Sequence, residues 1–207
     1  MRLAIVDLDN TLYRADLGVF ARMNARITAF MIEELGLAPE EADRLRQRYW
    51  RQYGSTLYGL IRHHGVDPER YLQVVHDVAP EELINPDPAL DAALAAIPVR
   101  KVIHTNATRE HAERVLAALG VRRHFAAIYD IRFDGYRPKP NERALLAICA
   151  EEKVRPNEAL VVDDAEENLA AARRLGCLTA HVSETPNLDW DFAVSRPHAL
   201  AALWRAA

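Results

Sequence analysis

The chain has 207 residues, half of them hydrophobic, and is therefore long enough to bury a sizeable core. Its 26 basic and 30 acidic residues give a formal net charge of −4. Because the basic residues are spread along the chain and form no run or stripe, we expect neither a nucleic-acid nor a membrane partner.

The cysteines and the N-terminal residues indicate in which cellular compartment the protein is expected. Cys149 and Cys177 lie in apolar segments without metal-ligand spacing, which indicates buried thiols in a reducing environment. Arg2 is followed by a very short apolar stretch and then by acidic residues, the wrong order for a signal peptide. No apolar run approaches the ~18 residues that a membrane span needs. We expect a cytoplasmic protein, and the sequence does not indicate its oligomeric state.

The predicted strands are short apolar runs, most of them followed by helical patterns. These runs are LAIVDL (3–8), VRKVIHT (99–105), AAIYDI (126–131), ALVVDD (159–164) and the shorter LTAHV (178–182). Thr108 is a predicted N-cap of a helix that stops at Gly120, and another helix stops at Gly176. This alternation predicts an α/β fold with a doubly wound, Rossmann-like parallel sheet.

Residues 14–87 show helical periodicity and no convincing strand. Glycines and prolines divide the segment, and Asp67 and Pro68 form a predicted N-cap and first helical residue. We therefore predict an all-helical module inserted after the first strand. The α/β core would consist of residues 1–13 and 88–207, and the helical module of residues 14–87.

The first strand leads to two carboxylates, Asp7 and Asp9. Residues two apart in a strand project from the same face, so both can reach one point if the strand extends that far. Carboxylates held close together repel unless a cation or a proton lies between them, and their oxygens suit Mg²⁺. The alternative is an ordinary acidic surface turn.

Polar residues follow the other strands as well. Thr105 and Asn106 follow the second strand, at a turn where a hydroxyl and backbone N–H groups can hold an anionic oxygen. Lys139, between two prolines, offers a compact ammonium to a phosphate. The alternative is that Thr105, Asn106 and Lys139 are ordinary loop residues. Ligands of open α/β sheets bind beyond the carboxyl ends of the strands, so we expect these side chains to share one crevice.

The fourth strand ends in Asp163 and Asp164, which would add negative charge to the same crevice. Such a cluster implies a divalent cation. The alternative role for Asp164 is to cap the following helix. Asn168, four residues later, could orient a ligand.

The order Asp-x-Asp-x-Thr, Thr, Lys-Pro, Asp-Asp resembles the haloacid dehalogenase superfamily of phosphohydrolases. Its motifs stand in IVDLDNTLY, VIHTNAT, RPKP and VVDDAEEN, and the helical insertion resembles that superfamily's cap. The stretches YWRQYGSTLYGLIRHHGVDPERYLQVVHD and HTNATREHAERVLAALG resemble the pyrimidine 5′-nucleotidase branch. Arg137 departs from that pattern, because relatives often place Cys before the Pro-Lys pair.

The resemblance implies a Mg²⁺-dependent phosphatase that acts on a small phosphorylated metabolite such as UMP or CMP. Asp7 would be the nucleophile, and Asp9 a general acid and base whose pKa is raised in the closed site. Asp7, the backbone carbonyl of Asp9 and Asp164 would hold Mg²⁺, with Asp163 as a further ligand or a supporting partner. Thr105, Asn106 and Lys139 would bind the phosphoryl group.

Five residues of the helical module are candidates for contact with a nucleoside: Tyr49, Tyr53, Thr56, Tyr58 and His64. The alternative is that these side chains form the core of the module itself, because aromatic residues at helical spacing usually pack inward. We therefore do not count them as site residues.

Three other functions are open to a chain with these motifs. A haloacid dehalogenase needs neither a metal nor a proton donor, so Asp9 and the Asp163–Asp164 pair argue against it. A sugar phosphomutase, or a phosphatase for another small metabolite, shares every core residue. A signalling domain with a phosphoacceptor aspartate combines similar residues, but it normally has its acidic pair on the first strand and no helical insertion.

Overall fold

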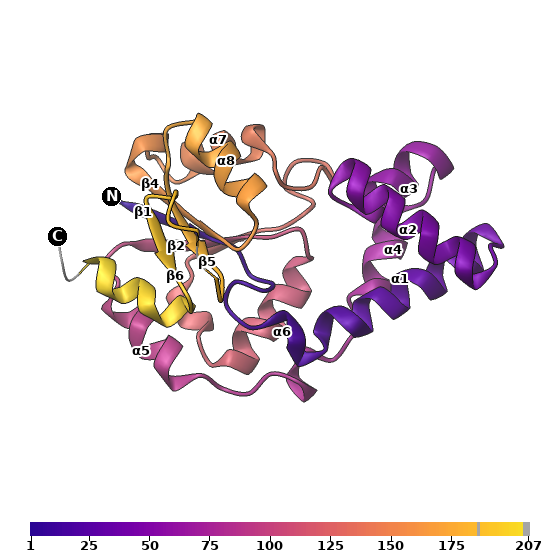
Figure 1. Ribbon diagram of the computed structural model, residues 1–207, viewed down its shortest axis with the longest axis horizontal. Coiled ribbons are helices and arrows are strands. Elements are labelled where there is room, and N and C mark those ends of the chain that lie inside the picture. Colours follow the sequence, from indigo (N-terminus) through magenta and orange to yellow (C-terminus); the bar gives the residue numbers. More distant parts are fainter. Residues whose placement is uncertain (186, 205–207) are drawn as a thin grey trace.

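A six-stranded parallel sheet forms the centre of the protein, in the order β3-β2-β1-β4-β5-β6 (Figure 1). The computed structural model describes residues 1–185 and 187–204. The strands are β1 (Leu3–Val6), β2 (Arg100–His104), β3 (Ala127–Tyr129), β4 (Ala159–Asp163), β5 (Leu178–Val182) and β6 (Phe192–Val194). All five predicted strands are present, which confirms the α/β prediction.

Helices cover both faces of the sheet, as in a doubly wound fold. One face packs against α5 (Pro88–Ala96), α6 (Arg109–Leu119) and the 3₁₀ helix η5 (Pro197–Trp204), and the other against α7 (Glu142–Glu151) and α8 (Glu166–Arg174). Strand β1 is buried on both faces: Ala4 and Val6 pack into the core on the side of α5 and α6, whereas Leu3 and Ile5 pack into the core on the side of α7 and α8. A central strand buried on both sides has to be continuously apolar.

The structure adds one strand that the sequence did not predict and shortens others. Strand β6 has only three residues and lies at the sheet edge beside β5, so its short apolar run gave no clear signal. Strand β1 ends at Val6, before the two predicted carboxylates. Strand β3 ends at Tyr129, and the chain turns at once.

Four α-helices lie between β1 and α5, which confirms that the inserted segment is helical. They are α1 (Val19–Leu35), α2 (Pro39–Tyr53), α3 (Thr56–His64) and α4 (Pro68–Val75), here called the helical unit. Gly36, Gly54 and Gly65 end the first three with positive φ angles, and the Asp67 carboxylate accepts from Glu69 N at the start of α4. The unit has its own core, which includes Phe30, Met31 and Leu60.

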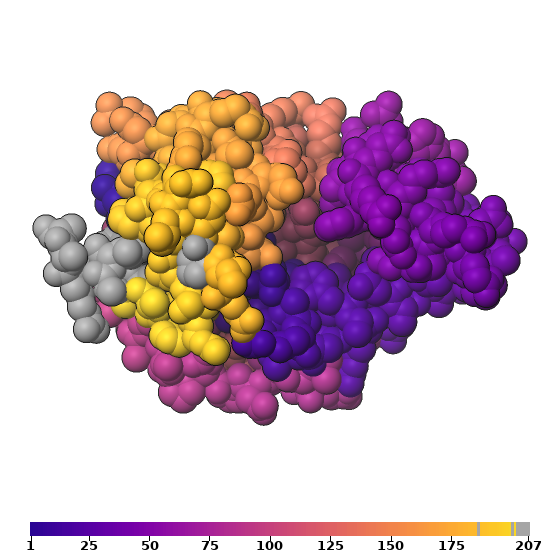
Figure 2. Space-filling model, in the orientation of Figure 1, coloured from indigo at the N-terminus to yellow at the C-terminus, as the bar shows by residue number. Residues whose placement is uncertain are grey.

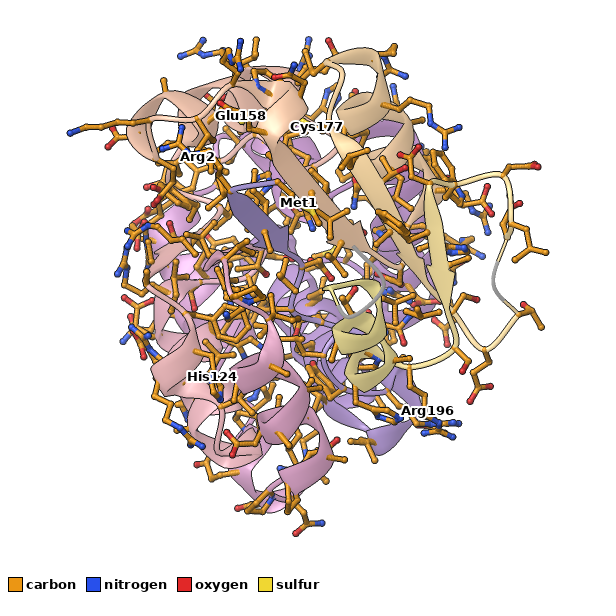
Figure 3. The ribbon with its side chains drawn as sticks, turned by 90° about the vertical axis from the view of Figure 1, so that its left-hand side faces the viewer. Met1, Arg2, His124, Glu158, Cys177 and Arg196 are labelled. Atoms are coloured by element: carbon orange, nitrogen blue, oxygen red, sulfur yellow. The ribbon has the colours of Figure 1, made fainter. Side chains whose placement is uncertain are left out.

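The two ends of the sheet differ in what surrounds them. The helical unit stands beyond the end where β1 leads to Asp7, whereas the N-terminus lies at the opposite end (Figure 1). Figure 3 views the molecule from that opposite end, where Arg2 lies close to Glu158. Arg2 N donates to Glu158 O at 2.7 Å, which ties the first residues to the start of β4. In residues 1–185 and 187–204, no helix has the length and apolar character to cross a bilayer.

Candidate active site

A cavity of about 470 Å³ lies between the carboxyl end of the sheet and the helical unit. Figure 2 shows the molecular surface hollowed between these two parts. All seven predicted site residues line it: Asp7, Asp9, Thr105, Asn106, Lys139, Asp163 and Asp164. The loops that follow parallel strands converge at one edge of a sheet, and this brings together residues up to 157 positions apart in the chain.

Lys139 lies at the centre of the buried charges. Its Nζ donates to Asp7 Oδ1 at 2.5 Å and to Asp163 Oδ2 at 2.8 Å. All three side chains are less than 10% exposed, so the ammonium neutralises charge where water cannot. Although burial lowers it, the carboxylates of Asp163 and Asp7 raise the pKa of Lys139 above its usual value. The lysine is therefore a fixed positive charge.

Asp163 holds this lysine and the beginning of α8. Its second oxygen, Oδ1, accepts hydrogen bonds from Ala165 N and Asn168 Nδ2, each at 2.9 Å. The residue before α8 is Ala165, and Asp164 does not cap that helix, so the alternative capping role for Asp164 is wrong. The predicted Asn168 is present in the cavity and orients Asp163.

Asp164 faces the loop after β1. Asn10 Nδ2 donates to its Oδ2 at 2.6 Å, and Thr11 Oγ1 donates to its Oδ1 at 3.3 Å. Burial raises the pKa of Asp164. Thr11 thus joins the turn after β1 to the end of β4.

Asp7, Asp163 and Asp164 form a candidate metal centre. One carboxylate oxygen from each lies within 4.8 Å of the other two. Three carboxylates around a single ammonium leave an excess of negative charge, and oxygen donors of this kind suit Mg²⁺. Burial raises the pKa of Asp7 to about 8, with Lys139 opposing and Asp163 adding to the shift. A divalent cation would relieve this repulsion, so the residues present fit a magnesium ion.

Asp9 turns away from this cluster. Its Oδ1 accepts from Tyr13 Oη at 2.5 Å and pairs with His111 Nε2 at 3.0 Å, while Oδ2 lies 3.5 Å from Thr105 Oγ1. The two carboxylates therefore point to different partners, because the strand does not extend to them. The side chain of Asp9 therefore does not belong to the cluster of three carboxylates.

The raised pKa expected for Asp9 concerns the closed site, whereas in the arrangement seen here the pKa of Asp9 is lowered. Burial alone would raise it, but the His111 ring and the hydrogen bonds from His111 and Tyr13 hold the pKa of Asp9 below its usual value. The contacts with Tyr13 and His111 had no signal in the sequence. The contact with His111 joins positions 102 residues apart.

Thr105 and Asn106 lie in the loop between β2 and α6. Thr105 Oγ1 accepts from Ala107 N at 3.0 Å, so its hydroxyl is held at the cavity wall. Asn106 Oδ1 accepts from Lys139 N at 2.8 Å and thereby fastens the backbone of the lysine loop. The side chain of Asn106 therefore accepts a hydrogen bond from the Lys139 backbone.

The helical unit lines the cavity mostly with residues other than the five candidates. Of those five, only Thr56 lines it. Tyr49 Oη bonds to His64 Nε2 at 2.8 Å, and Tyr53 packs edge-on against Tyr58, so these four belong to the packing of the unit itself. The cavity wall instead includes Phe20, Asn24, Arg46 and Trp50. Helical spacing alone does not tell which face of α2 turns toward the sheet.

Comparison with known proteins gives one family match over most of the chain. The model of haloacid dehalogenase-like hydrolases matches residues 1–176. A curated relative from Saccharomyces cerevisiae, named Phosphate metabolism protein 8, is 27% identical over 210 residues, a match that covers 93% of this chain. This chain spans 65% of the length of that relative.

Solved structures of similar fold carry several different descriptions. A HAD phosphatase from Thermococcus onnurineus has a TM-score of 0.66 and 16% identity, over 99% of this chain and 98% of its own. A 2-haloacid dehalogenase from Pseudomonas syringae pv. tomato has a TM-score of 0.65 and 20% identity, over 100% of both chains. A putative HAD-hydrolase from Bacillus subtilis, bound to magnesium, has a TM-score of 0.65 and 15% identity, over 99% of this chain and 98% of its own. At these identities the likeness shows the fold.

Proposed function

Because the chain belongs to the haloacid dehalogenase-like hydrolase family, we propose that it is a magnesium-dependent phosphomonoester hydrolase with Asp7 as the nucleophile. The observation that carries the proposal is the contact of Lys139 with both Asp7 and Asp163, beside a third carboxylate. A dehalogenase needs no metal-binding carboxylate cluster and no proton carrier. A phosphoryl-transfer enzyme needs both.

Asp7 attacks the phosphorus atom, so a bond forms between its carboxylate oxygen and phosphorus while the bond to the leaving oxygen breaks. Lys139 Nζ and Thr105 Oγ1 contact the transferring phosphoryl oxygens. Asp7, Asp164, the backbone carbonyl of Asp9 and, as a supporting partner, Asp163 would hold Mg²⁺. When bound, the ion neutralises negative charge on the phosphoryl group.

Asp9 carries the proton in both halves of the reaction. It gives a proton to the leaving oxygen, and later accepts one from the water that breaks the bond between Asp7 and phosphorus. A phosphate dianion beside Asp9 raises the pKa of this carboxyl by like-charge repulsion, in the opposite direction to the effect of His111 and Tyr13. Substrate binding therefore prepares Asp9 to act as an acid.

We propose a pyrimidine nucleoside 5′-monophosphate such as UMP or CMP as the substrate. Trp50 is 63% exposed and lines the cavity, so its indole is available to stack on a flat ring. Arg46 Nη1 bonds to Asn24 Oδ1 at 2.9 Å, and both line the same wall, where they could bind the polar edge of a base. Residues 14–87 would form the cap that excludes water, and residues 1–13 and 88–207 the catalytic core. A cytoplasmic location remains part of this proposal.

A sugar phosphomutase, or a phosphatase for another small phosphometabolite, uses the same catalytic residues and is the principal alternative. A phosphoacceptor signalling domain is the alternative outside enzymes. It would take up one phosphoryl group per molecule, whereas a hydrolase turns over many times.

The test is phosphate release from a panel of UMP, CMP, dTMP, AMP, GMP, several sugar phosphates and p-nitrophenyl phosphate, with and without Mg²⁺. We expect turnover that is lost on chelation of Mg²⁺ and that is fastest with the pyrimidine nucleotides. Turnover with sugar phosphates alone would keep the catalytic proposal and overturn the substrate. An enzyme indifferent to chelation would overturn the mechanism, and stoichiometric phosphorylation would favour the signalling domain.

A further inference from the structure

The carboxyl group of Asp9 is held by one of its two oxygens. Tyr13 Oη at 2.5 Å and His111 Nε2 at 3.0 Å both contact Oδ1. An oxygen that accepts two hydrogen bonds has little capacity to carry a proton as well. The other oxygen, Oδ2, lies on the side of Thr105, whose hydroxyl lines the catalytic cavity. Any proton that Asp9 exchanges with a substrate therefore belongs on Oδ2.

The His111 ring is oriented to donate to Asp9. Its side chain is fully buried, and Nδ1 has no hydrogen-bond partner among the described residues. A buried N–H without an acceptor costs free energy, so the ring proton belongs on Nε2, where Asp9 accepts it. The position of the ring follows from the helix that carries it, because His111 N donates to Thr108 Oγ1 at 3.2 Å in the first turn of α6.

The helical unit supports the same ring from behind. The ring of His76, directly after α4, lies 5.2 Å from the ring of His111, and His76 Nδ1 bonds to Leu72 O at 3.1 Å. His111 is thus fixed by the core helix that follows Thr105 and by the end of α4. A buried ring that touches a reacting carboxylate and is held on two sides has one orientation available.

We propose that His111 is a positioning residue for Asp9, which fixes Oδ1 so that Oδ2 faces the leaving oxygen of the substrate. The inference rests on the proposed phosphatase function and adds a residue to it. The proposal predicts that loss of His111 affects two kinds of substrate to different extents. A misplaced Asp9 slows the release of a poor leaving group, which needs the proton, more than the release of p-nitrophenolate, which does not.

The experiment measures kcat/KM for UMP and for p-nitrophenyl phosphate. For each substrate, kcat/KM reports the steps up to and including the departure of the leaving group. The His111→Phe variant keeps a ring but loses the donor, and we expect kcat/KM to fall about tenfold to hundredfold with UMP and about threefold or less with p-nitrophenyl phosphate. The His111→Gln variant places an amide N–H where Nε2 lies, so it should recover much of the activity on UMP. His111→Asn is too short to reach Asp9 and should behave like His111→Phe.

If His111→Phe does not fold, the comparison of His111→Gln with His111→Asn still tests the proposal, because these two side chains differ by one methylene group. His124→Gln is the control for loss of a histidine, because His124 bonds to Asp91 on the outer side of the core. Equal losses on both substrates, or a Gln variant no better than the Asn variant, would overturn the proposal. If the wild type releases phosphate from no member of the substrate panel, the phosphatase function itself fails; if it acts only on a sugar phosphate, that substrate takes the place of UMP in the comparison. An active wild type with unchanged variants rejects His111 alone.

Discussion

Asp7 lies in a cluster of charged side chains, so we expect removal of its carboxylate to affect catalysis and metal binding but not the hydrophobic core. The side chain shares its surroundings with Asp163, Asp164 and a single ammonium from Lys139. Asn has the same shape as Asp, carries no charge and is a far weaker nucleophile. The substitution therefore separates the chemistry of this position from its packing.

We predict that Asp7→Asn lowers turnover by at least about 10³-fold while the protein stays folded. Removal of one of three clustered negative charges should also weaken the rise in melting temperature that Mg²⁺ causes in the wild type, since a ligand stabilises the state that binds it. Phosphate release and thermal unfolding, each with and without Mg²⁺, check both effects. The control is Asn168→Ala, which removes a hydrogen bond to Asp163 without changing the charge of the cluster. Activity near that of the wild type would exclude Asp7 as the nucleophile.

The sequence predicted which candidate site residues meet, but not all the hydrogen bonds that they make. Asp7, Thr105 and Asp163 stand at or directly after strands β1, β2 and β4, and parallel topology is enough to bring such residues to one edge. The partners of Asp9 depend on where β1 stops and how the following loop turns. Neither His111 nor Tyr13 could be assigned to this carboxylate before the loop geometry was known.

At the scale of elements, local signals placed the helix ends well. Thr108 caps α6 through its side chain, Gly120 ends that helix with a φ of 76°, and Asp67 caps α4. Cap and glycine signals act within a few residues, so one sequence suffices to read them. The face that a helix turns to its neighbour depends on tertiary packing, and the orientation of α2 could therefore not be predicted.

Helices α2 and α3 pack so closely that one glycine is required between them. A Cβ on Gly59 would lie 2.6 Å from Tyr49 Cδ2 and 2.7 Å from Tyr49 Cβ. Helix propensity favours Ala over Gly by about 1 kcal/mol, whereas overpacking of a filled core costs about 1–3 kcal/mol. Because the ring of Tyr49 is buried and held by His64, the clash should win.

We predict that Gly59→Ala lowers the free energy of unfolding by about 1–3 kcal/mol, against the direction of helix propensity. Urea denaturation checks the size of this effect. The control is a double-mutant cycle with Tyr49→Ala, in which the added methyl group has space and should become neutral or stabilising. An equal cost in both backgrounds would mean that Tyr49 is not the cause.

At the scale of the whole molecule, the helical unit is joined to the core at several polar contacts. Arg132, after β3, donates to Glu69 of α4 and to Glu110 of α6, each at 2.9 Å, and Tyr136 Oη donates to the same Glu69 at 2.8 Å. Gly54 lies against the loop that carries Lys139, since a Cβ there would be 3.1 Å from Lys139 O. The unit therefore lies directly against the segment that carries the lysine.

The buried His76 makes this junction sensitive to pH. Burial, and after it the nearby His111 and Arg132, lower the pKa of His76 to about 4, although the Leu72 carbonyl and Asp9 oppose the shift. In the unfolded chain the pKa of histidine is about 6.5, so unfolding takes up a proton at any pH between these values. Stability from the neutral ring is complete above pH ~6.5 and is lost as the pH falls toward 4.

We predict that His76→Gln removes a pH-dependent contribution of about 1.4 kcal/mol per pH unit below pH ~6.5. Urea denaturation of both proteins at about pH 7 and about pH 5 measures it as a difference between wild type and variant. The comparison is needed because Asp7, with its raised pKa, makes the metal-free protein more stable as the pH falls, and this effect is common to both. The stability of the wild type should therefore fall relative to that of the variant on acidification. Parallel pH profiles would show that His76 is not held neutral at the junction, and that the contact between the helical unit and the core does not depend on its charge.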